Sequence, residues 1–499
     1  MNNAETRQKC AADELTAPQL ARQCDVVVIG GGISGLATAC YLARQGKQVQ
    51  LFEQADRSGG KIATSCVDGY VTEAAASMLM NFLPEVEQFL VDSQMVDSKT
   101  MRHSSVGQNR FMLKDGRLWP ISMKAASFFS SGFLDLNSKL RLMLEWAVPA
   151  HNQADETVEN FISRRLGKQL LEQAIEPFVA GTLACDVKLA SADAVLPRLK
   201  ALEKKYGSIT AGILVNKLLR RRTAATPEVF SFDGGMQTLI DKLSRERNFS
   251  LHLNTGVTAL EKCHKGWRIS IASVESNKAR MQQIEARQIV MATPANVTAK
   301  LLQSCDPSLA KVLAGIKYAP MNLVHLGFNQ TDVPHALNGI GFLVPKAENS
   351  SLLGNLWMSS VFAQRAPQGK VLLTSYLGGS RLPEVGSWSD QHCIRQVRNN
   401  LKKYLNIDAT PDMLRLDRHK AALPLYHGDY AQKTRWIKQR LSNHQGLFIN
   451  ANYLDGVSVR DRIVQARQTA ELMQNKHGEK SLIQTGCQCS SITTSFEAR

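Results

Sequence analysis

The residues with the clearest chemical pattern lie between Cys24 and Gly60. An apolar run ends at Ile29 and leads into Gly30-x-Gly32-x-x-Gly35, and Glu53 closes a second apolar run 18 residues after the last glycine. A glycine turn that opens a helix leaves backbone N–H groups free for phosphate, and an acid at the end of the next strand accepts hydrogen bonds from a ribose. The pattern predicts a dinucleotide site; the alternative is a glycine-rich turn without a ligand. Its expected residues are Gly30, Gly32, Ile33, Ser34, Gly35, Glu53 and Gln54.

A second glycine pair follows the acid, in Arg57-Ser58-Gly59-Gly60-Lys61. This run resembles the R-x-G-G-[KR] continuation of the large family of flavin amine oxidases, carotene desaturases and protoporphyrinogen oxidases. The resemblance implies that the dinucleotide is FAD, with Gly60 beside the phosphates and Lys61 as a countercharge. Taken alone, Lys61 is equally well interpreted as a solvated surface lysine.

Length and composition indicate a globular protein of two or three domains, with 499 residues, 44% hydrophobic and 21% charged. The formal net charge is +16. The sequence has no nucleic-acid motif and no aromatic residues interleaved with basic ones, so the expected partner of this charge is an anionic membrane surface or an acidic substrate. The basic run Lys217–Arg222 is either a solvated helix face or a membrane contact.

The cysteine pattern indicates a reducing compartment and no metal site, because the ten cysteines include no CxxC pair and no zinc-type Cys/His spacing. No run of eighteen apolar residues is present, so we expect no membrane-spanning helix. The first 23 residues carry Glu5, Asp13 and Glu14 and lack the apolar centre of a secretory signal. We therefore expect a cytoplasmic protein, either free or on the inner face of the membrane.

The expected fold class is α/β (α+β). It has a Rossmann-type FAD-binding domain assembled from discontinuous segments, a mixed-sheet substrate domain and a helical, membrane-associating domain. The order of strand and helix patterns assigns 24–94, 226–300 and 440–475 to the FAD-binding domain and 95–225 to the helical domain. The substrate domain is expected in 301–439 with part of 95–120. Residues 1–23 are expected to be flexible and 476–499 disordered.

Two later segments are expected to complete the FAD site. The segment Thr255–Thr258 ends a strand, and the backbone of Val257 is placed at the adenine edge. A C-terminal run enters a helix at about Ser458, and this helix N-terminus would stabilise negative charge on a reduced flavin. The expected contacts there are Asn452, Gly456, Val457 and Ser458.

Longer motifs resemble the protoporphyrinogen oxidase family, including its flavin-type coproporphyrinogen oxidases, over about residues 24–470. They are Arg164–Gly167 with Ile175–Gly181, Ser231–Leu239, Gly339–Pro345, Leu352–Phe362 and Asn452–Val459. The resemblance implies removal of six electrons and six protons from a porphyrinogen, with oxygen as acceptor and hydrogen peroxide as product. It also implies membrane association through the aromatic and basic region Leu118–Trp146, which includes Trp119, Phe128, Phe129 and Phe133. The alternative is a helical domain that packs its own core. A homodimer stays open.

The resemblance also implies a substrate site that is apolar with a cation at one end. Arg110 corresponds to an arginine that pairs with a propionate, and Phe342 and Leu343 correspond to residues that sandwich the rings. Gly181 and Thr182 would border the substrate, and Ala75 and Ser77 would contact the flavin. No general base is evident.

Three segments depart from the family pattern. Ala74–Ser77 lacks an expected Gly-Pro, Thr182–Cys185 lacks an aromatic residue and a glycine, and Ala451 replaces a glycine. An added Cβ narrows a close backbone approach. A related oxidoreductase with an altered substrate, such as coproporphyrinogen III or another cyclic or polyene compound, therefore stays open. Amine oxidation and a non-catalytic, tetrapyrrole-binding flavoprotein are further alternatives.

Overall fold

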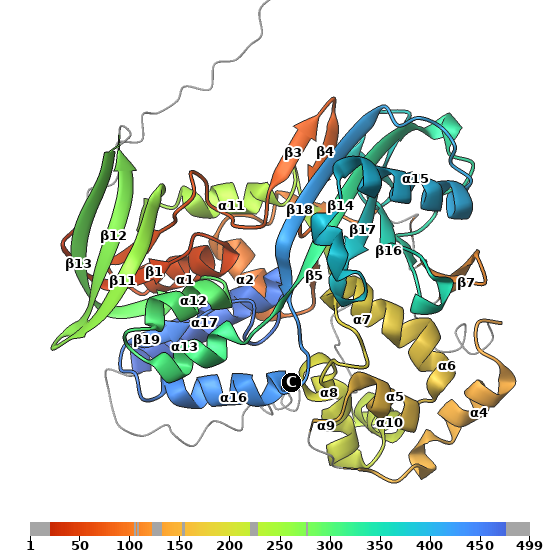
Figure 1. Ribbon diagram of the computed structural model, residues 1–499, viewed down its shortest axis with the longest axis horizontal. Coiled ribbons are helices and arrows are strands. Elements are labelled where there is room, and N and C mark those ends of the chain that lie inside the picture. The colour runs from red at the N-terminus through yellow and green to blue at the C-terminus, as the bar shows by residue number, and fades with distance from the viewer. Residues whose placement is uncertain are drawn as a thin grey trace, which may run out of the picture.

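The computed structural model describes residues 20–103, 106, 109–121, 132–151, 155–219, 228–275 and 278–475. Two large sheets lie side by side, with a group of helices below the second (Figure 1). Most of the N-terminal segment, the C-terminal tail, Phe128, Phe129 and the arginines 220–222 lie outside the described residues.

The first sheet has the strand order β10-β2-β1-β13-β12-β11, with β19 paired to β13. Five strands, β10, β2, β1, β13 and β19, pair in parallel, so their carboxyl ends meet at one edge. The strands are β1 (Gln23–Ile29), β2 (Val49–Phe52), β10 (Ser250–His252), β11 (Thr255–Cys263), β12 (Gly266–Glu275), β13 (Lys278–Met291) and β19 (Leu447–Ile449).

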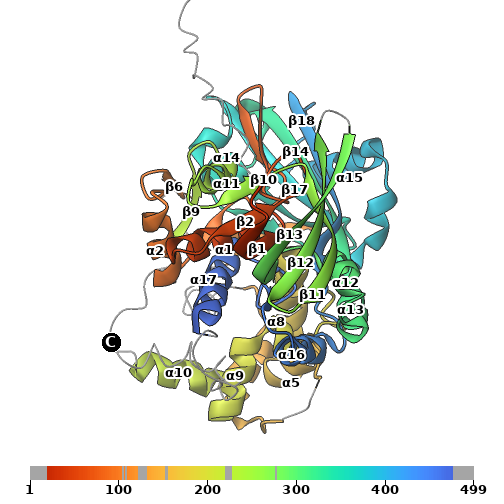
Figure 2. The same ribbon diagram turned by 90° about the vertical axis from the view of Figure 1, so that its left-hand side faces the viewer.

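Helices cover both faces of this sheet because its central strands are apolar on both faces. Val26 and Val28 pack toward α1 and α17, whereas Val27 and Ile29 belong to the cluster with α12, α13 and α16 (Figure 2). The helices of this region are α1 (Ile33–Arg44), α2 (Pro84–Asp92), α11 (Gln237–Ser244), α12 (Ala295–Leu302), α13 (Pro307–Ala314), α16 (Tyr430–Leu441) and α17 (Val459–Asn475).

The second sheet has the order β18-β14-β17-β16-β15-β7-β8, with β18 on the side of the first sheet (Figure 1). Alternate side chains of its strands pack on helix α15 (Asp390–Leu405), and the intervening ones face the interior of the molecule. Its strands are β7 (Arg110–Lys114), β8 (Arg117–Ile121), β14 (Tyr318–Asn329), β15 (Gly341–Leu343), β16 (Leu352–Trp357), β17 (Lys370–Gly378) and β18 (Met413–Pro424). Short helical turns here are η4 (Gln330–Asp332), η5 (Lys346–Glu348), α14 (Met358–Val361), η6 (Ala363–Arg365), η7 (Gly379–Arg381) and η8 (Pro383–Ser387).

Two small sheets join the regions. Strands β3 (Thr64–Val67) and β4 (Tyr70–Glu73) form a hairpin, and β5 (Leu79–Asn81), β9 (Glu228–Phe232) and β6 (Lys99–Met101) form the other.

Among the residues that the structure describes, residues 99–101, 110–114 and 117–121 form strands, and the first helix of the helical region begins at Leu136. Its elements are α4 (Leu136–Met143), η2 (Glu145–Ala147), α5 (Val158–Arg165), α6 (Lys168–Leu170), η3 (Leu171–Ile175), α7 (Glu176–Leu183), α8 (Ala192–Val195), α9 (Pro197–Tyr206) and α10 (Ile209–Leu219). Within the described residues, no helix combines the length and apolar character needed to cross a membrane.

Candidate functional site

A cavity of about 620 Å³ lies where the carboxyl ends of the parallel strands meet. Its wall includes residues that directly follow β1, β2, β13 and β19, and it extends to the second sheet. In open α/β sheets, ligands bind in the crevice beyond this edge. The cavity is therefore the site to which the sequence pattern points. It gathers most of the predicted residues, namely Gly30, Gly32, Ile33, Ser34, Glu53, Gln54, Gly60, Lys61, Ala75, Gly181, Thr182, Val257, Asn452, Val457 and Ser458.

The three glycines of the first motif have different physical roles. Gly30 has φ +107°, and a Cβ on Gly35 would lie 1.9 Å from the carbonyl oxygen of Gly30, so both glycines serve the packing of α1 on β1. A Cβ on Gly32 would meet no protein atom within 4 Å. Gly32 therefore leaves open space at the N-terminus of α1, where a pyrophosphate can approach the free N–H groups.

Glu53 is held at the end of β2 by backbone donors. Its carboxylate accepts hydrogen bonds from the N–H groups of Gly31 at 2.7 Å and Ala55 at 2.9 Å. The segment from Thr255 to Val257 lies on the same cavity wall. That segment begins strand β11, whereas the sequence had suggested the end of a strand, because the chain turns just before it at Asn254, with φ +51°.

Lys61 connects the cavity to the second sheet. Its Nζ donates to the carbonyl oxygens of Ala421 and Ala422 on β18 and lies 5.6 Å from the centre of the Tyr318 ring. Burial lowers the pKa of Lys61 to about 8. The ammonium group is held in the cavity wall by carbonyl groups and is not solvated at the surface.

The start of α17 forms the other end of the dinucleotide site. The Oγ of Ser458 accepts the N–H of Asp461 at 3.1 Å, and the Asp461 carboxylate accepts the N–H of Ser458 at 3.2 Å. This reciprocal cap aligns the first turn of α17 with the cavity. Gly456 has φ +104° and does not line the cavity; a Cβ there would lie 2.4 Å from the Asp461 carboxylate.

Buried Arg462 also lines the cavity, with 2% of its surface exposed. Its Nε has no hydrogen-bond partner, and no carboxylate of the described residues lies within ion-pair distance. A buried charge needs a partner. An open glycine cradle, an oriented acid and an unpaired buried cation together fit an anionic dinucleotide such as FAD.

The wall beyond the dinucleotide site is largely apolar. It includes Met321 and Leu323 of β14, Leu423 of β18, and Gly181 and Thr182 of α7. Tyr376 of β17 lies on the same wall, and burial raises its pKa to about 12. This wall fits a large apolar ligand.

His419 is a functional candidate that the motifs did not reveal. Its Nε2 lies 2.6 Å from the carbonyl oxygen of Ala74 and must donate, because a carbonyl only accepts. In the neutral ring this leaves Nδ1 as an acceptor at the cavity. The sequence around His419 carries no motif that indicates a role for this histidine.

Several predicted substrate residues lie elsewhere. Phe342 is buried against α15 and contacts Tyr404, while Leu343 points to the opposite face, against Gly181, without lining the cavity. The two were expected to sandwich the rings of the substrate. Neighbours in a strand face opposite sides, and neither side chain lines the cavity, so a substrate contact of these residues stays a prediction. Arg110, on β7, also lies outside the cavity wall, and burial beside Arg102 lowers its pKa.

Some of the residues that depart from the family pattern line the cavity, and others do not. Ala75, Ala76 and Ala451 line the cavity, whereas Ser77 does not. Cys185 is fully buried, and its Sγ accepts the N–H of Tyr426 at 3.4 Å. Burial raises the pKa of the Cys185 thiol to about 11, so this residue belongs to the core and not to the cavity wall.

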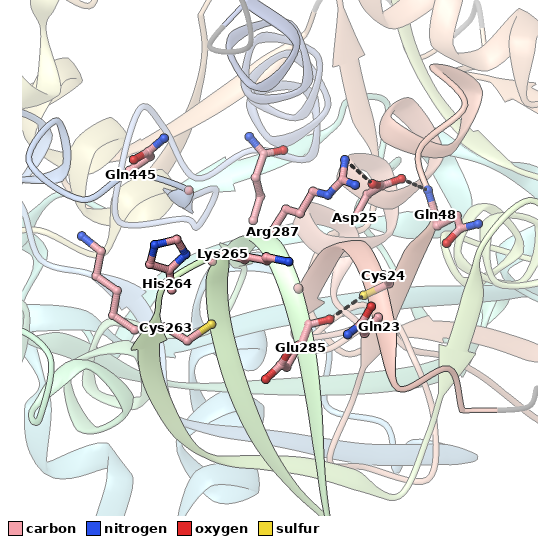
Figure 3. Close-up of a pocket in the computed structure, with 15 residues that line it drawn as sticks. Gln23, Cys24, Asp25, Gln48, Cys263, His264, Lys265, Glu285, Arg287 and Gln445 are labelled. Carbon is pink, nitrogen blue, oxygen red and sulfur yellow. Dashed lines mark hydrogen bonds and ion pairs between the residues drawn. The ribbon is translucent and has the colours of Figure 1, made fainter.

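A second cavity, of about 660 Å³, lies at the beginning of β1, beside the middle of β13 (Figure 3). One ion pair lies in its wall: Asp25 lies 3.5 Å from Arg287 and also accepts the N–H of Gln48 at 3.0 Å. Burial raises the pKa of Cys24 in this cavity to about 11. The cavity sits at the amino ends of the parallel strands, away from the edge that binds dinucleotides.

Comparison with known proteins agrees with this geometry. The sequence profile of the family described as flavin containing amine oxidoreductase matches residues 33–474. The mitochondrial protoporphyrinogen oxidase of Nicotiana tabacum is 30% identical, over 90% of this chain and 94% of that protein. The coproporphyrinogen III oxidase of Bacillus subtilis (strain 168) is 27% identical, over 89% and 96%.

Solved structures share the fold. A candidate protoporphyrinogen oxidase from Exiguobacterium sp. 255-15 has a TM-score of 0.73 at 21% identity, covering 92% of this chain and all of that one. Reduced UDP-galactopyranose mutase has a TM-score of 0.68 at 14% identity, covering 91% and 96%. Proteins with different named activities thus share this architecture, and the reaction has to be argued from the cavity.

Proposed function

The chain belongs to the flavin-containing amine oxidoreductase family, and on this basis we propose that it is an FAD-dependent oxidase of porphyrinogens in tetrapyrrole biosynthesis. One observation carries the proposal: a single cavity joins a phosphate-binding glycine turn to a large apolar wall. Oxygen is the proposed acceptor and hydrogen peroxide the product.

The reaction requires three two-electron rounds. FAD held in the cavity would supply the acceptor for a hydride equivalent from a bridging carbon of the substrate in each round. Over the three rounds three further hydrogens leave as protons, two from pyrrole N–H groups and one from the fourth bridging carbon, and three molecules of oxygen take up the electrons and protons as hydrogen peroxide. Six electrons and six protons thus leave the substrate. This chain must hold the macrocycle against the apolar wall, exclude water there and accept the protons.

We assign the proton acceptor to His419. The hydrogen bond to the Ala74 carbonyl holds the imidazole with its Nδ1 lone pair available. His419 is partly exposed, so a proton taken at Nδ1 can pass to water. His419→Gln retains an N–H donor for Ala74 but removes the base. We expect kcat/KM to fall about 100-fold, while FAD content stays unchanged.

The direct test uses the purified, FAD-loaded protein in air with protoporphyrinogen IX or coproporphyrinogen III. Porphyrin fluorescence and peroxide are followed above the autoxidation rate, with FAD-free protein as the control. Turnover of either compound supports the proposal and identifies the preferred substrate. A flavin-loaded protein that oxidises neither would overturn it and would favour a substrate altered by Ala75, Ala76 and Ala451 at the cavity.

We further propose that the helical region contacts an anionic membrane surface. Leu136, Leu140, Met143 and Leu144 recur on one side of α4 and its end and are exposed, as is Trp146 in η2. Helix α10, which packs on η2, adds exposed Ile213 and Leu214 and the cation Lys217. Exposed apolar side chains beside cations are typical of interfacial helices, which bind without crossing the bilayer.

Vesicle flotation tests this contact. Binding to vesicles of anionic lipid is expected for the parent protein and is expected to fall at least tenfold in Leu140→Glu/Leu144→Glu. The matched control is Leu414→Glu, which alters an exposed leucine on β18, outside the helical region. Equal binding by all three proteins would refute the assignment.

A further inference from the structure

Three arginines are buried in the described part of the chain: Arg165, Arg365 and Arg462. Arg165 lies 2.7 Å from Glu145, and Arg365 lies 2.7 Å from Glu73. Arg462 is the exception among them, because all of its described hydrogen-bond partners are neutral.

The guanidinium of Arg462 is held in place by three acceptors. It donates to Asn450 Oδ1 at 3.1 Å and to the carbonyl oxygens of Ala451 at 2.6 Å and Leu454 at 2.5 Å. These bonds orient the charge without neutralising it. Asp455 and Asp461 act on this charge only from beyond ion-pair distance, and each has a closer cation, since Asp455 pairs with Lys438 and Asp461 with Arg460.

Asn450 extends this contact to the phosphate-binding helix. Its Nδ2 donates to Thr38 Oγ1 at 2.9 Å and to the Ser34 carbonyl oxygen at 3.3 Å, both on α1. The charge of Arg462 thus lies between the first turns of α1 and α17, and both turns line the cavity. Burial there, out of water, strengthens its electrostatic interaction with whatever occupies the cavity.

We propose that Arg462 is a buried counterion of the bound cofactor that stabilises the negative charge gained by the flavin ring on reduction. The ring is the preferred partner because Arg462 lies one turn inside α17, beyond Val457 and Ser458, whereas α1 and Gly32 already offer free N–H groups to the phosphates. The field of Arg462 adds to that of the α17 N-terminus. The inference rests on FAD in the cavity and not on the identity of the substrate.

The experiment is a redox titration of the FAD-loaded protein with a reference dye and no porphyrinogen, combined with FAD binding to the apoprotein. Arg462→Gln retains amide donors for the loop carbonyls but removes the charge, and Arg462→Lys retains the charge. In Arg462→Gln we expect binding of reduced FAD to weaken about tenfold more than binding of oxidised FAD. For a two-electron couple this corresponds to a midpoint potential lower by about 30 mV. Arg462→Lys should recover most of the difference.

The matched control is Arg460→Gln, because Arg460 lies on the same helix, pairs with Asp461 and does not line the cavity. We expect its potential to equal that of the parent protein. Equal weakening of oxidised and reduced FAD in Arg462→Gln, with an unchanged potential, would overturn the proposal in favour of a phosphate contact or a purely structural role. An Arg462→Lys protein with the potential of Arg462→Gln would overturn it as well. If Arg462→Gln lowers the midpoint potential as expected but the parent protein does not oxidise porphyrinogens, only the proposed substrate is refuted.

Discussion

Arg165 in the helical region and Arg462 at the cavity are both buried, but the groups that surround them differ. Arg165 ends α5 with its Nη2 2.7 Å from Glu145, and Glu145 also accepts hydrogen bonds from Ser208 and Thr210. Burial alone would raise the pKa of Glu145, but these hydrogen bonds lower it. Arg462 is as deeply buried but has only neutral acceptors.

The difference separates structural charge from functional charge. The pair of Arg165 and Glu145 is complete within the protein, so the Arg-Arg-Leu-Gly motif that resembles the family serves the packing of helices α5, α9 and α10. Its neighbour Arg164 is likewise paired, with Glu156 at 3.0 Å and Glu203 at 2.8 Å. A buried charge left unpaired at a cavity wall indicates that its partner arrives with a ligand.

Breaking the ion pair between Arg165 and Glu145 is expected to have the largest effect on stability. Arg165→Met leaves the Glu145 carboxylate buried without its cation and should lower the free energy of unfolding by about 3–5 kcal/mol. Denaturant unfolding of the FAD-loaded protein measures it. The double variant Arg165→Met/Glu145→Gln should be more stable than Arg165→Met. If the double variant loses as much stability as the two single variants together, Arg165 and Glu145 do not stabilise the protein as a pair.

Replacing each of two glycines of the Gly30–Gly35 motif with alanine should separate the role of helix packing from that of cofactor binding. Gly35→Ala places a methyl against the Gly30 carbonyl oxygen and should destabilise the apoprotein by about 1–3 kcal/mol. Gly32→Ala meets no protein atom, so apoprotein stability should stay within about 0.5 kcal/mol while FAD affinity falls about tenfold. Thermal unfolding and fluorescence titration with FAD measure the two effects. A destabilised Gly32→Ala apoprotein would contradict the assignment.

A smaller effect is expected at Asp306, a buried carboxylate whose partner Arg440 is exposed to solvent. Burial alone would raise its pKa, but hydrogen bonds from Arg440, the Leu309 N–H and His444 lower it below its ordinary value. A lowered folded-state pKa stabilises the protein above the unfolded value near 4, and this contribution is lost as pH falls through the folded pKa. Asp306→Asn keeps the helix cap and should cost about 1 kcal/mol at pH 7. The stability curves of the two proteins should converge below pH 3; a constant gap would exclude the charge as the cause.

The smallest effect is expected for an exposed ion pair. Lys402 and Asp408 lie 2.8 Å apart with 61% and 73% of their side chains exposed. Solvent screens such a pair, so Lys402→Ala should change the free energy of unfolding by less than about 0.5 kcal/mol. The same denaturant experiment as for Arg165 measures it. A loss comparable to that of Arg165→Met would show that burial does not explain the contrast.

The phosphate-binding part of the site was predictable because it is local in sequence. One strand, one turn and one helix carry Gly30, Gly32 and Ser34, and the next strand brings Glu53. Fold class, family resemblance and cofactor follow from such contiguous patterns and are confirmed. The substrate wall was less predictable, because it is assembled from strands of the second sheet that are far apart in sequence.

The sequence did not determine which way side chains point or which buried charges are paired. The period of a strand shows that Phe342 and Leu343 face opposite sides, but only the packing of α15 decides which side is core. Neither His419 nor Arg462 stands in a motif that indicates a role. The role proposed for His419 depends on the distant Ala74 carbonyl, and that proposed for Arg462 depends on its having no carboxylate within ion-pair distance among the described residues.

By itself, the sequence determined the family and its flavin cofactor, because backbone conformation at glycines and the order of strand, turn and helix are encoded locally. The tertiary structure alone decided which buried charges are neutralised and which face the cavity. Electrostatic energy in a buried environment depends on the distances between groups, and those distances are set by how the two sheets and the helical region pack.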